Sequence, residues 1–195
     1  MELAEDMRRV ALAALLVLGV AACGGTKTVT TTETVTLPRT VTVTTQASQA
    51  APPPCKTADL SGTFNVEPGS AGAGQISYIL RLENTSADTC FVSGLPAALL
   101  IGEQGGALPT NVQPATPGAA TAAKVVLKPH EAAVATARFS PDVPGGSEQT
   151  DGPCEPRAFT FHLTIGEGTL DVPIRPPTPV CERGTMFFSA FTAAG

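Results

Sequence analysis

The sequence predicts an all-β fold for residues 55–195: an immunoglobulin-like antiparallel β-sandwich of two sheets, preceded by a signal peptide and a disordered tether. Segments in which apolar and polar residues alternate are typical of strands that bury one face. Turn-forming residues separate these segments at intervals of about 10 to 15 residues. The 19 Gly and 18 Pro of the 195-residue chain disfavour helix interiors. No strand candidate is followed by a long helical repeat, which argues against an α/β fold.

Nine segments of the sequence are predicted as strands. The strongest is residues 159–165, and residues 76–83 alternate as cleanly, with Ile76, Tyr78, Leu80 and Leu82 on one face. Residues 133–139 fit a weaker strand and can also form a short helix. The remaining candidates are residues 60–66, 97–101, 108–112, 125–127, 170–174 and 186–191.

The first 23 residues have the pattern of an export signal. Arg8 and Arg9 precede an apolar run of 13 residues that ends at Ala22; as a helix this run is about 20 Å long, too short to span a membrane core of about 30 Å. Residues 18–23 resemble a bacterial lipobox, in which the cysteine is lipidated and becomes the new N-terminus. We therefore expect a signal peptide over residues 1–22 and lipid attachment at Cys23, with cleavage but no lipidation as the alternative.

This processing implies a location. Two or more acyl chains hold a protein stably on a bilayer, so a diacylglyceryl group on Cys23 predicts a protein anchored on the outer face of the cell membrane. Acidic residues before Arg8 are unusual in such a signal, and we expect translation to start at Met7.

Residues 23–54 are predicted to be a disordered tether rich in Thr and Pro. Eleven Thr occur in residues 26–45, where they alternate with Val as in a strand. Both faces of such a strand would be almost entirely polar and Pro38 would interrupt it, so little apolar area is available to offset the ordering entropy. An ordered strand is the alternative. Thr-rich tethers are also plausible O-glycosylation substrates.

The charge of the predicted domain limits its partners. Residues 55–195 contain eight Lys or Arg and thirteen Asp or Glu, with no basic cluster. Because nucleic-acid binding and electrostatic docking on anionic lipid both need clustered cations, we expect no nucleic-acid partner. Contact with the membrane is expected through the lipid anchor alone.

The four cysteines of the domain predict two disulfides. An even number of cysteines in an exported domain is typical of disulfide bonding, and four cysteines allow three connectivities. The sequential pairing, Cys55–Cys90 and Cys154–Cys181, is favoured because each bond would fasten one end of the domain. A zinc site is the alternative, but the sequence has no C-x-x-C pair and neither His is close to two cysteines.

A search for catalytic motifs finds none that is complete. His130 and Glu131 begin like the zinc-binding H-E-x-x-H pattern, but Val134 stands where the second His is required. We expect His130 in a loop and His162 on the solvated face of its strand. G-x-S-x-G, S-x-x-K and phosphate-loop patterns are absent. The sequence therefore predicts no catalytic residue, no metal site and no cofactor, and a protein that is not an enzyme.

Three further segments are ambiguous. The Asn84-Thr-Ser motif fits N-glycosylation, but a turn before Cys90 is the simpler interpretation. The acidic residues of the loop 141–156 lack the spacing of a calcium loop, which favours a solvated loop over a Ca²⁺ site. The Gly-rich residues 69–74 precede a strand, which favours a hairpin over an anion-binding loop.

One family shares this arrangement of residues. Cys55 followed by Asp59-Leu60, residues 80–86, Cys90 to Pro96 and the late Cys154 and Cys181 resemble the actinobacterial exported family called domain of unknown function 4232. Residues 84–96 are the most specific part. Two departures are that His130 stands where the family often has Gly, and that the family often has Trp near Phe139. The resemblance implies a lipoprotein or membrane-linked β domain and brings no catalytic residues with it.

Three functions are compatible with these features. The first is a tethered binding or structural module of the cell envelope, with residues 113–121 and 141–156 as the places to test. The second is an envelope lipoprotein that binds a small ligand or a metal. The third is an envelope enzyme, which would require a cleft joining His162 to a carboxylate and a hydroxyl.

Overall fold

The computed structural model describes residues 51–195 except residues 119–120, 122–123, 147, 149 and 167. The predicted signal peptide, Cys23 and residues 23–50 of the predicted tether lie outside this part of the chain. Its elements are, in order, η1 (Thr57–Asp59), β1 (Leu60–Val66), β2 (Ile76–Asn84), β3 (Cys90–Val92), β4 (Ala97–Gly102), β5 (Ala107–Leu108), β6 (Asn111–Pro114), β7 (Val125–Leu127), β8 (Ala132–Phe139), β9 (Arg157–Ile165), β10 (Gly168–Pro179), α1 (Cys181–Gly184), β11 (Thr185–Phe188) and β12 (Thr192–Ala193). None of the helices in the described residues is long and apolar enough to cross a membrane.

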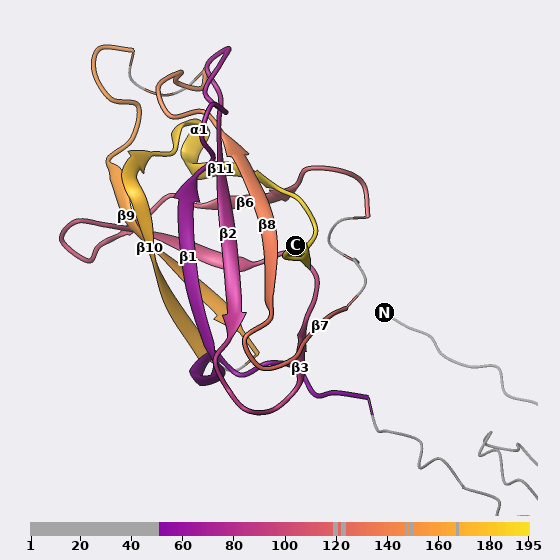
Figure 1. The fold of residues 1–195 in the computed structure, drawn as a ribbon. Coiled ribbons are helices and arrows are strands. Elements are labelled where there is room, and N and C mark those ends of the chain that lie inside the picture. Colours follow the sequence, from indigo (N-terminus) through magenta and orange to yellow (C-terminus); the bar gives the residue numbers. More distant parts are fainter. Residues whose placement is uncertain (1–50, 119–120, 122–123, 147, 149, 167) are drawn as a thin grey trace, which may run out of the picture. The chain divides into compact units, whose positions relative to one another are not determined.

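The all-β prediction is confirmed, but the strands are arranged differently from two separate sheets. Among the described residues, ten strands form one sheet in the order β5-β4-β9-β10-β1-β2-β8-β11-β6, with β12 paired to β8, and β3 and β7 form a second sheet. The large sheet is curled (Figure 1). Its two halves are joined by the short parallel pairing of β1 with β10, in which Phe64 lies opposite Ile174. This non-local pairing is what distinguishes the fold from the predicted sandwich.

The core lies inside the curl and is built from aromatic rings of both halves of the sheet. Phe64 of β1 stacks on Phe161 of β9 with ring centroids 4.9 Å apart, and Phe161 stacks on Phe188 of β11 at 5.7 Å. Tyr78 and Phe139 extend this cluster. The Tyr78 hydroxyl donates a hydrogen bond of 2.8 Å to the carbonyl of Pro176, so its polar atom is satisfied within an apolar site.

Alternation of side chains explains the elements that the sequence predicted best. In β2, Tyr78, Leu80 and Leu82 are buried and the residues between them are more exposed, as expected for a strand with one face on the core. β8 faces the same core with Ala133, Ala135 and other small residues, which indicates a strand and not the alternative short helix.

Several predicted strands have different limits in the structure. The predicted strand 170–174 is the longer β10, Gly168–Pro179. The predicted strand 108–112 is divided into β5 and β6, because Thr110 between them bonds to its surroundings: its hydroxyl accepts from the Leu100 N–H at 2.8 Å and donates to the Leu108 carbonyl at 2.9 Å. The predicted strand 186–191 ends at Phe188. β3 was not predicted; it pairs with β7, which places Cys90 opposite Leu127.

The structure pairs Cys55 with Cys90 and Cys154 with Cys181, the sequential connectivity. The Cα atoms of the two pairs are 4.8 and 5.5 Å apart. The bonds close segments with sequence separations of 35 and 27 residues, and on the chain-entropy model each stabilises the fold by about 3–4 kcal/mol. Just before the first cysteine, Pro54 forms a β-bridge with Phe91, so ordered contacts begin within the last residues of the predicted tether.

Candidate functional site

The outer face of the sheet carries an exposed aromatic side chain next to an arginine. Met186 and Phe188 of β11 point into the core and are fully buried, so Phe187 between them points outward and is 42% exposed. The register places Phe187 opposite Arg138 of β8 on one side and Gln113 of β6 on the other. A hollow of about 320 Å³ lies between Gln75, Ala115, Arg138 and Phe187. We call Gln113, Arg138 and Phe187 the outer row.

The outer row lies at the edge of the large sheet. β6 is the last strand in the sheet order and pairs with β11 alone. Its outward side chains bond along the strand and to its neighbour: Gln113 Nε2 donates to Asn111 Oδ1 at 2.6 Å, and Asn111 Nδ2 donates to Thr185 Oγ1 of β11 at 3.1 Å. An edge strand offers unpaired backbone donors and acceptors that an extended peptide can join. The predicted binding segment 113–121 therefore begins in a strand edge; residues 119–120 within it lie outside the described residues.

A second distinctive place is the carboxylate of Glu148, in the predicted acidic loop 141–156. Glu148 Oε2 accepts hydrogen bonds from the N–H groups of Gly145 at 2.6 Å and Glu182 at 2.9 Å, and Oε1 accepts one from the N–H of Arg183. Glu182 and Arg183 both have φ 56° and ψ 43°, a left-handed pair that turns successive N–H groups toward one anion. Glu148 thus fastens its loop to α1.

This environment shifts two carboxyl groups in opposite directions. Partial desolvation raises the pKa of Glu148, but the three backbone donors and the positive charge of Arg183 outweigh it, so the pKa lies below its ordinary value. The pKa of Glu155 is raised, first by desolvation and then by the negative charge of Glu148. The loop therefore favours the ionised form of Glu148 and the protonated form of Glu155 relative to ordinary carboxyl groups.

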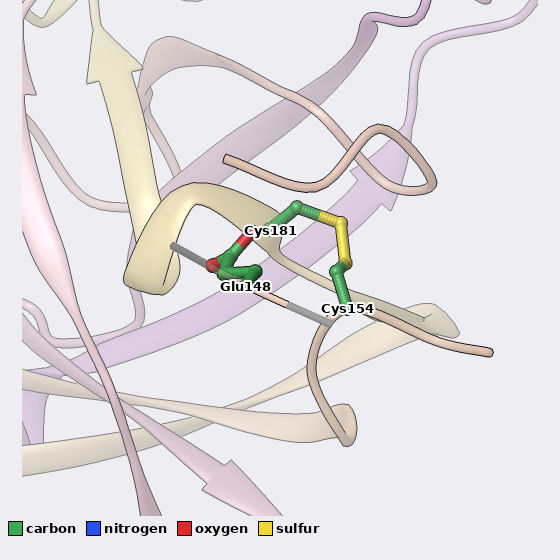
Figure 2. A group of neighbouring side chains, drawn as sticks. All are labelled: Glu148, Cys154 and Cys181. Carbon is green, nitrogen blue, oxygen red and sulfur yellow. A yellow bond between two sulfur atoms is a disulfide. The ribbon is translucent and has the colours of Figure 1, made fainter. Parts of the chain in front are cut away.

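The disulfide Cys154–Cys181 joins the same two segments beside Glu148 (Figure 2). The two sulfur atoms and a carboxylate oxygen of Glu148 all lie within 4.8 Å of one another. Cys181 is buried, whereas Cys154 is partly exposed. In the oxidised form the sulfurs are bonded to each other, so their arrangement serves to hold the loop.

The two histidines do not come together. His130 lies in the turn after β7 with φ 65°, the left-handed region in which Gly is at ease. His162 lies on the outer face of β9, where its Nδ1 atom contacts the carboxylate of Asp171 on the adjacent strand β10. Leu99 of β4 is opposite His162 on the other side. The pair is an open cross-strand contact and not the cleft that the enzyme hypothesis requires.

Asn84 has a structural role that the sequence did not reveal. Its side chain is fully buried at the end of β2, although the motif Asn84-Thr-Ser suggested a turn or a glycosylation acceptor. Nδ2 donates to the carbonyls of Asp88 at 2.7 Å and Leu127 at 3.1 Å, and Oδ1 accepts from Ser86 N–H and hydroxyl at 3.0 and 2.8 Å. Its amide is fully engaged in joining β2 to β7 and the following turn.

These features define a disulfide-linked, all-β domain with an exposed sheet edge and no assembled catalytic constellation among the described residues. The chain belongs to the family described as domain of unknown function (DUF4232), whose family model matches residues 55–191. No curated protein and no solved structure matched the chain.

Proposed function

We propose that this protein is a lipid-anchored, non-catalytic binding module on the outer face of the cell membrane, in an envelope of the actinobacterial type. The observation that carries the proposal is the outer row beside the edge strand β6. An exposed Phe with an Arg at its side is the composition typical of energetic hot spots in protein interfaces. Among the described residues Arg138 forms no salt bridge, so its charge is free to meet an acidic group.

The partner that fits this surface is an extended acidic segment of another envelope protein. Its backbone would pair with the free edge of β6, an acidic side chain would meet Arg138, and an apolar side chain would cover Phe187. Backbone pairing of this kind supplies affinity, and the two side-chain contacts supply selectivity.

Site-specific photo-crosslinking in intact cells tests this proposal. A photoreactive amino acid at Gln113 should give a discrete crosslinked product, because this side chain projects from the edge strand. The matched control carries the same amino acid at Leu99, which is 37% exposed on β4, and should not give that product. Arg138→Glu and Phe187→Ser should each abolish crosslinking from Gln113. The same product from both positions, or a product indifferent to both substitutions, would refute the binding surface.

The anchor is tested separately. The lipobox supports attachment at Cys23, and Cys23→Ser should release a folded protein into the medium while the unaltered protein stays with the membrane fraction. Release of an unfolded protein, or no release, would contradict a separable anchor on Cys23.

The immunoglobulin-like prediction is retained in a modified form. We infer that the curled sheet is a derivative of an immunoglobulin-like sandwich in which the β1–β10 pairing joins the two layers. The stacking of Phe64 on Phe161 across the core, with centroids 4.9 Å apart, supports two facing layers. Amide hydrogen exchange tests this inference. Protection at Asn65 and Ile174 as strong as at the centres of the two layers would contradict it and favour one continuous sheet.

A second candidate function is binding of a small apolar ligand. A cavity of about 170 Å³ lies beside the Cys55–Cys90 disulfide, and its apolar lining includes Leu82, Leu95 and Leu163. Native mass spectrometry of the purified protein, before and after a chelator, distinguishes ligand and metal adducts from the empty chain. Absence of any adduct would remove this candidate.

A further inference from the structure

We propose that reduction of the Cys154–Cys181 disulfide creates a binding site for a thiophilic divalent cation, Zn²⁺ being the best fit. The ligands are the two released sulfurs and the carboxylate of Glu148 (Figure 2). The oxidised protein lacks this site because the sulfurs are bonded to each other. The inference is independent of the proposed partner surface, whose outer row contains none of these residues.

The spacing of the donor atoms suits a zinc ion. The three donors lie within 4.8 Å of one another. Zn–S bonds of about 2.3 Å and Zn–O bonds of about 2.0–2.2 Å in a tetrahedral site place donors roughly 3.3–3.8 Å apart. Once the sulfur–sulfur bond is broken, the sulfurs need only separate to this distance while the Glu148 oxygen approaches by at most about 1.5 Å.

Glu148 is already held in the position that a ligand needs. A carboxylate offers about four lone-pair positions on its two oxygens, and the backbone donors of Gly145, Glu182 and Arg183 use three of them. Oε1, which accepts only from Arg183 in these bonds, keeps a position for the metal. Because the same bonds fasten the loop to α1, they also keep Cys154 close to Cys181 after reduction. Such outer hydrogen bonds orient metal ligands.

Glu155 follows Cys154 directly in the sequence. Its carboxylate or a water molecule would complete a four-coordinate site.

Cys154–Cys181 is the disulfide that a reductant reaches first. Cys55 and Cys90 are 3% and 5% exposed and belong to the hydrophobic core, whereas Cys154 is partly exposed. Thiol–disulfide exchange requires access to a sulfur atom. A dithiol attacks that sulfur and closes to its own cyclic disulfide, giving up two electrons and two protons, and Cys154 and Cys181 become thiols. Zn²⁺ then replaces the two thiol protons, which are released to solvent.

The test uses the full chain carrying Cys23→Ser, so that only the disulfide cysteines can become thiols. The protein is treated with a mild dithiol under anaerobic conditions, the reductant is removed, and Co²⁺ is titrated as a spectroscopic substitute for Zn²⁺. We expect one equivalent to bind with a thiolate-to-cobalt charge-transfer band, and Zn²⁺ to displace it. The oxidised protein should show no such band.

Two variants at the loop distinguish the ligand from a general charge effect. Glu148→Gln should weaken cobalt binding by about tenfold or more, whereas Asp142→Asn, an exposed position on the same loop with the same charge change, should leave it unchanged. Circular dichroism verifies that both variants are folded.

X-ray absorption of the cobalt form supplies a readout that does not depend on a variant. Two sulfur neighbours at the metal support the proposal. Four sulfur neighbours, none, or no stoichiometric binding by the reduced protein would overturn it, as would equal affinities of the Glu148→Gln and Asp142→Asn proteins.

Discussion

Replacement of the buried Asn84 gives the sharpest test of how the fold is held together. Asn84→Ala removes two donated and two accepted hydrogen bonds from a site with no solvent exposure. Each such bond contributes about 0.5–1.5 kcal/mol to stability, and some of the groups left without a partner will bond to water instead. We therefore expect a loss of about 2–4 kcal/mol in the free energy of unfolding.

Asn84→Asp separates hydrogen bonding from size, because the two side chains have nearly the same shape. At neutral pH a carboxylate oxygen would replace the Nδ2 donor and face the carbonyl oxygens of Asp88 and Leu127. A buried charge beside two acceptors costs more than an absent side chain, so Asn84→Asp should be less stable than Asn84→Ala. At low pH the protonated carboxyl regains one donor, and the difference between the two variants should narrow.

Urea unfolding followed by far-UV circular dichroism measures these free energies at both pH values. Asn65→Ala is the matched control, since Asn65 is exposed on β1 and its replacement should change stability by no more than about 0.5 kcal/mol. The reasoning would be refuted by an Asn84→Ala protein as stable as the control. It would also be refuted by an Asn84→Asp protein that is no less stable than Asn84→Ala at neutral pH.

Three further predictions concern stability. The folded-state pKa of Glu148 is lower than its ordinary value of 4.5, so the ionised carboxylate stabilises the fold fully above that value and loses this effect as the pH falls through the lowered pKa. The difference in unfolding free energy between the unaltered protein and Glu148→Gln should therefore vanish on acidification. A difference that stays constant with pH would contradict this. Gly184→Ala should be strongly destabilised because its new Cβ would lie 1.9 Å from the Pro109 carbonyl oxygen. Gly69→Ala is the control: it is also at positive φ but has no atom within 4 Å of the new Cβ, and it should lose only about 1 kcal/mol in thermal or urea unfolding. Equal losses of stability in the two variants would be inconsistent with the contact at Gly184. Phe64→Ala should cost about 3–5 kcal/mol in the same assay, since its ring stacks on two others in the core, and a loss below 1 kcal/mol would be incompatible with that packing.

Local patterns predicted the strands, but not how the sheet closes. The limits of β1 follow from apolar alternation and nearby turn residues, and those of β7 follow from a three-residue apolar run that ends before Lys128-Pro129. The β1–β10 pairing joins residues about a hundred positions apart through backbone atoms, which composition does not encode. β3, like β7, has only three residues, too few for a period of two to be recognised, and the sequence indicated only a turn and a disulfide cysteine at this point.

The functional surfaces were harder to predict for a related reason. Met186, Phe187 and Phe188 are all apolar, so alternation alone could not decide which of them faces outward. Glu148 is bound by backbone N–H groups of two non-glycine residues in the left-handed region, a conformation with no sequence signal here. The pairing of the cysteines could be favoured from chain order, because it needs only proximity along the chain.

The Cys154–Cys181 disulfide at α1 and the outer row are close together in the chain, so one experiment can examine both. Cys181 and Gly184 bound α1, which leads directly into β11 and Phe187. Gly184 also packs against residues 109–110, just before the edge strand β6. A change at Cys181 on reduction would therefore reach the starts of β11 and β6, which carry Phe187 and Gln113 of the outer row. Crosslinking from Gln113 in the oxidised and in the reduced, metal-loaded protein would measure that connection directly. Equal yields would mean that reduction of Cys154–Cys181 does not change the edge strand β6. Unequal yields would mean that it does.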